Sequence, residues 1–285
     1  MSLEQAFRKL EPRGLDSRDL ERWQDGQKQK KGGTSGRHRL KYLYRTISSK
    51  EAELMDKAST IFAHVKKEGR KSLLETEAKT VCADYGIPVT KFKLAKSETE
   101  ASRFAKELGF PVVLKIVSPD IIHKSDVGGV AIGLKDAEAV KNAFEQIMKN
   151  VKKHDAKARI VGVLVQEMAP PSTEVIVGAI KDPQFGPALM FGLGGIFVEV
   201  LKDVTFRIAP ITVDEARDMI SEVKAYPLLK GYRNTPPADV GAIVKILLST
   251  SKLIMEHQEI KELDLNPIMV YEKGAKTVDA RIILE

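Results

Sequence analysis

The sequence predicts an α+β fold with antiparallel sheets. Amphipathic helical segments and short β-rich runs bounded by Gly or Pro both occur along the chain. Their order lacks the strict strand–helix alternation of a doubly wound parallel sheet. The chain has 285 residues, 43% of them hydrophobic, enough to bury one large core or two smaller ones. Its single cysteine, Cys82, excludes an intramolecular disulfide framework.

Residues 1–54 differ from the rest of the chain in charge and composition. The whole chain has a formal net charge of +7, and residues 1–50 contain 13 Lys and Arg against 6 Asp and Glu, a surplus of the same size. This segment is too polar to offset chain entropy by burial, so we expect a disordered basic extension. It is a nucleic-acid or partner-binding arm, a solvated tail, or a segment upstream of a natural start at Met55.

The first half of the folded region contains helices with recognisable ends. One helix is predicted over residues 72–85, with Ser72 as its N-cap. Another is predicted over residues 97–108, between the N-cap Ser97 and the terminating Gly109. The other segments expected here are strands at 89–94 and 111–117 and a helix at 136–152.

The second half is richer in strands. Two helices are predicted at 212–224 and 236–257, where apolar residues follow helical spacing. The expected strands are 160–167, 174–180, 188–191, 196–200, 260–270 and 277–284, the last two joined by a turn at 272–274. No segment is long and apolar enough to span a bilayer and no secretory signal is visible, so we expect a cytoplasmic protein.

The strand at 111–117 and the loop after it carry the clearest chemical signal. Lys115 is the one charged residue in an apolar run, which is costly unless its ammonium meets an anion. The loop SPDIIHKSDVGGV adds His123, hydroxyl groups and the pair Gly128–Gly129, a set of groups suited to binding phosphate. The alternatives are a lysine that reaches solvent at a sheet edge and a plain Gly-Gly hairpin turn.

Acidic and amide side chains near the end of the chain form a second group. Strand alternation places Asp264 and Asn266 on one face, and the closing hairpin can bring Asp279 beside them. Two or three such oxygen ligands, completed by phosphate and water, suit Mg²⁺. A satisfied Asp/Asn turn and a surface pair between Asp279 and Arg281 explain the same spacing.

The run Gly192-Leu193-Gly194-Gly195 precedes the acid-bearing segment that ends near Glu199. It is either part of a phosphate channel or a tight turn. It does not match the phosphate-binding or dinucleotide-binding glycine motifs, because their spacing and the following Lys are absent.

Five motifs, taken in order, resemble the β subunit of an ADP-forming acetyl-CoA (acyl-CoA) synthetase. They are Lys115, SPDIIHKSDVGGV, LVQEMAPPSTEVIVG, FGLGGIFVEVLKDVTFR and ELDLNPI with VDARI. This is an ATP-grasp protein related to the β subunit of succinyl-CoA synthetase. The resemblance covers roughly residues 58–285.

The resemblance implies an ATP-grasp fold, in which two α+β subdomains clasp a nucleotide. The lid would comprise about 90–168, and the palm about 58–89 with 169–285. The implied reaction converts acyl-CoA, ADP and phosphate to a carboxylate, ATP and CoA through phosphohistidine. It implies ATP or ADP and Mg²⁺ as cofactors and a separate CoA-binding α subunit, with an α2β2 assembly by analogy.

The resemblance also assigns roles to individual residues. His123 would carry the phosphoryl group, and Asp264 would steady that histidine. Asn266 and Asp279 would bind Mg²⁺. The implied nucleotide-binding residues are Lys115, Gly128, Gly129, Gln166, Glu167, Met168, Glu174, Glu199 and Arg207, with the two glycines also serving as loop hinges.

Two other functions compete with this one. A stand-alone ATP-grasp ligase that joins a carboxylate to an amine needs no histidine in this loop, so His123 disfavours it. A nucleic-acid-binding protein would rely on the basic segment 1–54, which lacks interleaved aromatic residues for base stacking. The sequence leaves open which acyl group is used and whether the nucleotide is ADP or GDP.

Overall fold

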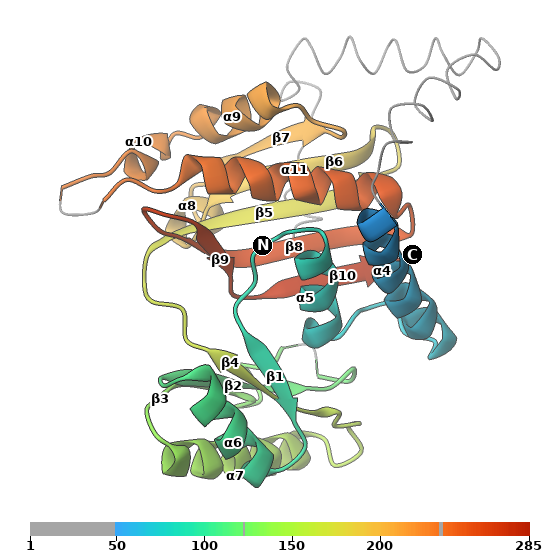
Figure 1. Cartoon of the computed structure of the whole chain (residues 1–285), viewed down its shortest axis with the longest axis vertical. Helices are drawn as coiled ribbons and strands as arrows, with labels where there is room; N and C mark the ends of the chain where they lie inside the picture. The colour runs from blue at the N-terminus through green and yellow to red at the C-terminus, as the bar shows by residue number, and fades with distance from the viewer. Residues whose placement is uncertain (1–48, 122, 234–235) are drawn as a thin grey trace.

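The computed structural model describes residues 49–121, 123–233 and 236–285, apart from the side chains of residues 49–56, 196 and 199. Within these ranges the chain forms two antiparallel sheets, each with its own hydrophobic core. The smaller sheet lies at one end of the molecule and the larger sheet at the other (Figure 1).

The smaller sheet has the strand order β1-β4-β2-β3. Its helices, α6 and α7, pack through Ala101, Ala105, Val140 and Phe144 against the strand residues Val112, Leu114 and Ile116 in one core. Because strand side chains alternate, Lys115 lies on the opposite face of β2 from these core residues. The elements are β1 (Phe92–Ala95), α6 (Glu98–Leu108), β2 (Val112–Val117), β3 (Val130–Leu134), α7 (Ala137–His154) and β4 (Gly162–Glu167).

The larger sheet has the strand order β10-β8-β5-β6-β7, with the short strand β9 paired to β8. The long helix α11 lies along this sheet, and α4 and α5 lie beside β10 (Figure 1). The elements are α4 (Ser49–Lys67), α5 (Glu75–Asp84), β5 (Thr173–Asp182), β6 (Gly186–Leu193), α8 (Ile196–Glu199), β7 (Val204–Ile208), α9 (Val213–Glu222), α10 (Tyr226–Leu229), α11 (Val240–Glu256), β8 (Ile260–Val270), β9 (Ala275–Thr277) and β10 (Ala280–Leu284).

The larger core joins segments from both ends of the folded chain. It contains Phe62 of α4, Cys82 of α5 and Leu247 of α11, all packed with strand residues such as Leu263 and Leu265. A separate, smaller apolar cluster, which includes Ile176 and Met190, covers the other face of the sheet. The predicted lid span, about 90–168, contains the whole smaller sheet, and the predicted palm spans contain the larger one.

The ends of two helices test the capping predictions. Helix α6 has the predicted caps, because the Ser97 hydroxyl accepts from the Glu100 N–H and Gly109 ends the helix with φ +88°. Helix α5 begins later than predicted. Its N-cap is Leu74, and Ser72 is still extended and bridged to Ile283 of β10. The sheet pairing of residues 72–73 therefore delays the helix start.

Several segments differ from the sequence prediction. The expected strand at 196–200 is the short helix α8, because Gly195 has φ +62° and its carbonyl accepts from the Val198 N–H at 3.2 Å. The edge strand β7, at Val204–Ile208, was not predicted. Helix α4 begins at Ser49, inside the segment expected to be disordered, and residues 1–48 lie outside the described ranges.

A search of the described helices finds none with the length and apolar character required to cross a bilayer.

Candidate functional site

Lys115 lies where the two sheets approach each other. Its ammonium donates to Glu75 Oε1 at 2.7 Å, to Asp279 Oδ2 at 3.0 Å and to the Val278 carbonyl at 3.3 Å. Burial opposes the charged form, but the carboxylates of Asp279 and Glu75 outweigh it and raise the pKa of Lys115. The expectation that this lysine meets an anion is confirmed: both carboxylates come from outside its own sheet.

Glu75, in the first turn of α5, is the centre of this cluster. Its carboxylate pairs with Lys115, with Lys79 at 3.1 Å and with Lys124. Burial alone would raise the pKa of Glu75, but the three ammonium groups overcome it and lower the pKa to about 2. The cluster therefore holds one buried carboxylate and three cations, with Asp279 as the second anion.

Residues 166–168, at the end of β4 and here called the hinge, also contact this cluster. Gln166 is fully buried, and its side-chain oxygen accepts from the Lys79 ammonium. Glu167 Oε1 accepts from the Lys91 N–H and the Lys276 ammonium, each at 2.9 Å. The Met168 N–H donates to the Pro111 carbonyl at 3.2 Å. These contacts anchor the hinge to both sheets.

Asn266 of β8 lies beside Asp279, as predicted, but Asp279 is in the break between β9 and β10, so the predicted strand at 277–284 is interrupted there. The Asn266 N–H donates to the Asp279 carbonyl at 3.3 Å, and the Asn266 side chain is exposed. An amide oxygen and a carboxylate from these neighbouring segments fit Mg²⁺ if phosphate and water complete the shell. Among the described residues, no group of three or more His, Cys, Asp or Glu could hold an ion by itself.

Asp264 is largely buried, and its Oδ1 has no hydrogen-bond partner in the described part of the chain. Burial and the nearby Glu262 and Asp279 carboxylates raise the pKa of Asp264 to about 7, and Arg281 offsets this in part. An acid with an unsatisfied oxygen can accept a hydrogen bond from an incoming group. The suggested Asp279–Arg281 surface pair is not formed, since Arg281 pairs with Glu262 at 3.4 Å.

The loop after β2 carries His123 on its surface. The His123 side chain is exposed and has no hydrogen bond or ion pair to any described residue. The next residue, Lys124, pairs with Glu75. Gly128 has φ +63°, and a Cβ on Gly129 would lie 2.6 Å from Ile116 Cγ2. The two glycines thus allow the turn to close against β2, and the structure supports the hairpin explanation for them.

The remaining predicted residues lie apart from this cluster. Glu174 is exposed and lines an open cavity of about 1190 Å³, between residues 171–173, Gly194–Gly195 and the turn from β8 to β9. Arg207 is buried and pairs with Glu222 of α9. In the register of β6 and β7, Arg207 is paired with Leu189, which belongs to the core between the larger sheet and its helices. The Glu199 side chain lies outside what the structure describes.

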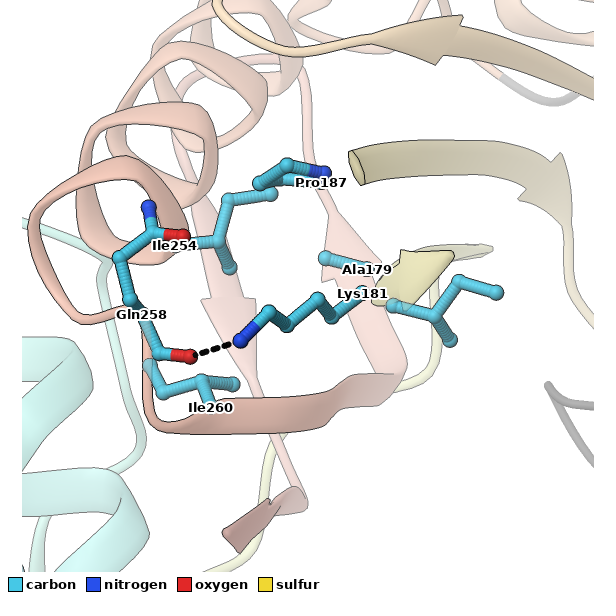
Figure 2. A pocket seen from close by; sticks show the side chains of 7 residues that line it. Ala179, Lys181, Pro187, Ile254, Gln258 and Ile260 are labelled. Atoms are coloured by element: carbon cyan, nitrogen blue, oxygen red, sulfur yellow. Dashed lines mark hydrogen bonds between the residues drawn. The ribbon is translucent and has the colours of Figure 1, made fainter. Parts of the chain in front are cut away.

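A second hollow, between β5 and the end of α11, offers no site. Figure 2 shows the Lys181 ammonium donating to the Gln258 carbonyl, at 2.9 Å, across a space with no room for a water molecule.

Sequence analysis missed Glu75, Lys79 and Lys124. Glu75 and Lys79 stand four residues apart on one helix face, where the pattern is typical of an exposed ion pair. Only the position of α5 against the smaller sheet shows that both are buried.

Comparison with known proteins gives the context of this site. The ATP-grasp domain family matches residues 64–284. Acetate–CoA ligase [ADP-forming] I subunit beta of Pyrococcus furiosus is 53% identical over 228 residues, covering 80% of this chain and 98% of that one.

Two solved structures of the dinucleotide forming acetyl-coenzyme A synthetase 1 of Ca. Korarchaeum cryptofilum are similar, each match covering 80% of this chain and 100% of that one. One contains coenzyme A, acetyl-coenzyme A and a phosphorylated phosphohistidine segment in a site I orientation, with 51% identity and a TM-score of 0.76. The other contains coenzyme A and Mg-AMPPCP, with that segment pointing towards the nucleotide binding site, with 50% identity and a TM-score of 0.72.

Proposed function

This chain belongs to the ATP-grasp β subunits of ADP-forming acetate–CoA ligases, and from that premise we propose how its residues share the reaction. The family reaction converts acetyl-CoA, ADP and phosphate to acetate, ATP and CoA through a phosphohistidine. The stand-alone carboxylate–amine ligase is disfavoured, because 98% of a β-subunit relative is matched.

His123 is the phosphoryl carrier in this proposal. The observation that carries it is the position of His123 on an exposed loop, one residue before Lys124, whose ammonium shares the Glu75 carboxylate with Lys115. A neutral imidazole is a competent nucleophile near pH 7. In ATP formation, a β-phosphate oxygen of ADP attacks the phosphorus, the P–N bond to His123 breaks, and the imidazole is released. Asp264 would steady the imidazole with its unsatisfied oxygen.

The nucleotide lies between the two sheets in this proposal. Lys115 would exchange part of its contact with Asp279 for a phosphate oxygen. Asn266 and Asp279 would hold Mg²⁺, which neutralises phosphate charge when bound. Gln166, Glu167 and Met168 form the hinge on which the adenine would rest, and Gly128 and Gly129 would let the loop move. Glu174 would contact the nucleotide from the cavity that it lines. Arg207 and Glu199 complete the proposed set as pocket residues without an assigned role.

The partner of this chain would be a CoA-binding α subunit, in an α2β2 assembly. The support is the similarity to a chain named as a beta subunit. A cytoplasmic location belongs to the same proposal, since the reaction draws on the cell's ADP and ATP. The family model matches residues 64–284, which leaves out the basic segment 1–54, so it lends no support to a nucleic-acid role for that segment.

The test uses this chain with its α partner and the variant His123→Asn. We expect ATP formation from acetyl-CoA, ADP and phosphate to fall by more than about a thousandfold, because the covalent carrier is lost. Acid-labile ³²P labelling of the chain should disappear, and ADP binding should persist. His154→Asn, at an exposed position on α7, is the matched control and should label normally. Normal ATP formation by His123→Asn would refute the proposal.

A further inference from the structure

Several ion pairs and side-chain hydrogen bonds described above join the smaller sheet and its loop to the segments packed on the larger sheet, and Glu75 takes part in two of them. It binds Lys115 of β2 and Lys124 of the His123 loop. Lys79, from the same helix as Glu75, reaches Gln166 of β4. The other two are Lys115 with Asp279 and Lys276 with Glu167.

The ion pair of Lys124 links the loop to the larger unit. Here the larger unit is the larger sheet with the helices of its core, and the smaller unit is the smaller sheet with α6 and α7. Among the described residues of 118–129, the other side-chain bonds stay within the smaller unit. Asp120 pairs with Arg159 at 3.1 Å, and Asn150 of α7 donates to the Gly128 carbonyl at 3.1 Å. Of the loop residues that the structure describes, Lys124 alone forms a side-chain ion pair with the larger unit.

Glu75 can release Lys124 without becoming an unpaired buried charge. Its side chain is 2% exposed, and Lys79 and Lys115 remain bound to it when Lys124 leaves. The Lys124 side chain is 21% exposed, so its ammonium can be rehydrated when it leaves Glu75. The pair therefore combines a fixed, buried anion with a cation that can detach.

We propose that Glu75 is a positioning residue that docks the His123 loop at the nucleotide site by binding Lys124. This inference rests on the proposed function of His123. Docking holds the imidazole beside the phosphate-binding Lys115, and undocking frees the loop to receive or deliver the phosphoryl group at the partner subunit. The Glu75–Lys124 pair thus biases the loop towards the nucleotide side of the reaction.

The test separates the two half-reactions in the full complex with the α subunit. The nucleotide side is the initial rate of acid-labile labelling of His123 by Mg²⁺ and [γ-³²P]ATP. The acyl side is labelling by acetyl-CoA and [³²P]phosphate without ADP. Lys124→Met should slow nucleotide-side labelling about tenfold, the loss expected for one charge-assisted bond, and leave the acyl-side rate within about twofold. The KM for ATP should stay within about twofold, since docking is not nucleotide binding.

Two variants complete the design. Lys124→Arg keeps the cation and should restore most of the nucleotide-side rate. Arg159→Met breaks the loop's other ion pair, inside the smaller unit, and should leave both rates near wild type. Glu75→Gln should also slow nucleotide-side labelling and leave the acyl-side rate unchanged. It removes the carboxylate shared by three lysines, however, and if Glu75→Gln fails to fold, the result for Lys124→Met decides the proposal.

Equal slowing of both half-reactions by Lys124→Met, or no slowing of either, would overturn the docking role. Failure of the proposed function is a different result. In that case the His123→Asn variant would be labelled as well as the wild-type protein, whether or not Lys124 is also substituted.

Discussion

The ammonium of Lys115 lies 3.0 Å from Asp279 Oδ2, so one ion pair joins the smaller sheet to the segment that precedes β10 of the larger one. The Lys115 side chain is nearly buried, whereas that of Asp279 is 37% exposed. The carboxylate is therefore accessible to a second cation. A nucleotide with its metal would give each partner a new ligand, phosphate for Lys115 and Mg²⁺ for Asp279.

Asp279→Ala should weaken binding of ADP mainly when Mg²⁺ is present. We expect the Kd for Mg-ADP to rise about ten- to a hundredfold, because a charged ligand is lost, and the Kd measured in EDTA to change less. Calorimetric titration in both conditions measures this. Glu107→Gln, which breaks the exposed pair with Lys93, is the control. An equal loss of affinity in EDTA would argue against Asp279 as a metal ligand.

Glu75→Gln should destabilise the fold strongly near neutral pH. Removing one partner of a buried ionic cluster costs about 3–5 kcal/mol. The pKa of Glu75 is lowered to about 2 in the fold, from an ordinary value of 4.5. Its stabilising contribution is thus present above about pH 4.5 and is lost as the pH falls towards 2. Urea unfolding of both proteins at pH 7 and pH 3.5 should show the gap narrowing, and a constant gap would contradict the assignment.

Lys79 should make the fold more stable as the pH rises above 8. Burial lowers the pKa of Lys79 to about 8, although Glu75 opposes this shift. Between about pH 8 and 10.5 the unfolded chain holds this proton and the folded chain releases it, so the free energy of unfolding increases with pH. Between pH 7.5 and 9.5, wild type should gain on the order of 2 kcal/mol relative to Lys79→Met. The exposed variant Lys93→Met should follow wild type.

Gly129→Ala should destabilise the His123 loop. The added Cβ would lie 2.6 Å from Ile116 Cγ2 and 2.9 Å from the Lys124 carbonyl oxygen, so both the core strand and the loop backbone must shift. We expect a loss of about 1–3 kcal/mol, the usual cost of overpacking. Thermal unfolding measures it, and hydrogen exchange at the Ile116 amide, which donates to the Gly129 carbonyl, locates it. Unchanged exchange and an unchanged Tm would show that the loop adapts freely.

Local sequence patterns predicted much of the architecture, because they act over a few residues. Ser97 and Gly109 fixed the ends of α6 through hydrogen bonds and backbone angles within the helix itself. The two closing strands placed Asn266 beside Asp279 through a short hairpin connection. Where pattern and structure disagreed, as at residues 196–200, a left-handed glycine redirected an apolar run into a helical turn.

The sequence by itself determined the α+β class, the helix α6, and the choice of Lys115, His123, Asn266 and Asp279 as the residues to explain. Only the tertiary structure revealed Glu75, which pairs with Lys115 and with Lys124, the residue after His123. Lys115 lies 40 residues from Glu75 and 164 from Asp279, so these contacts exist only where the two sheets meet. Periodicity along a chain reports which face a residue occupies. It does not predict which residues, distant in sequence, pack against that face. This packing buries Glu75 of α5 and brings its carboxylate into contact with three lysines.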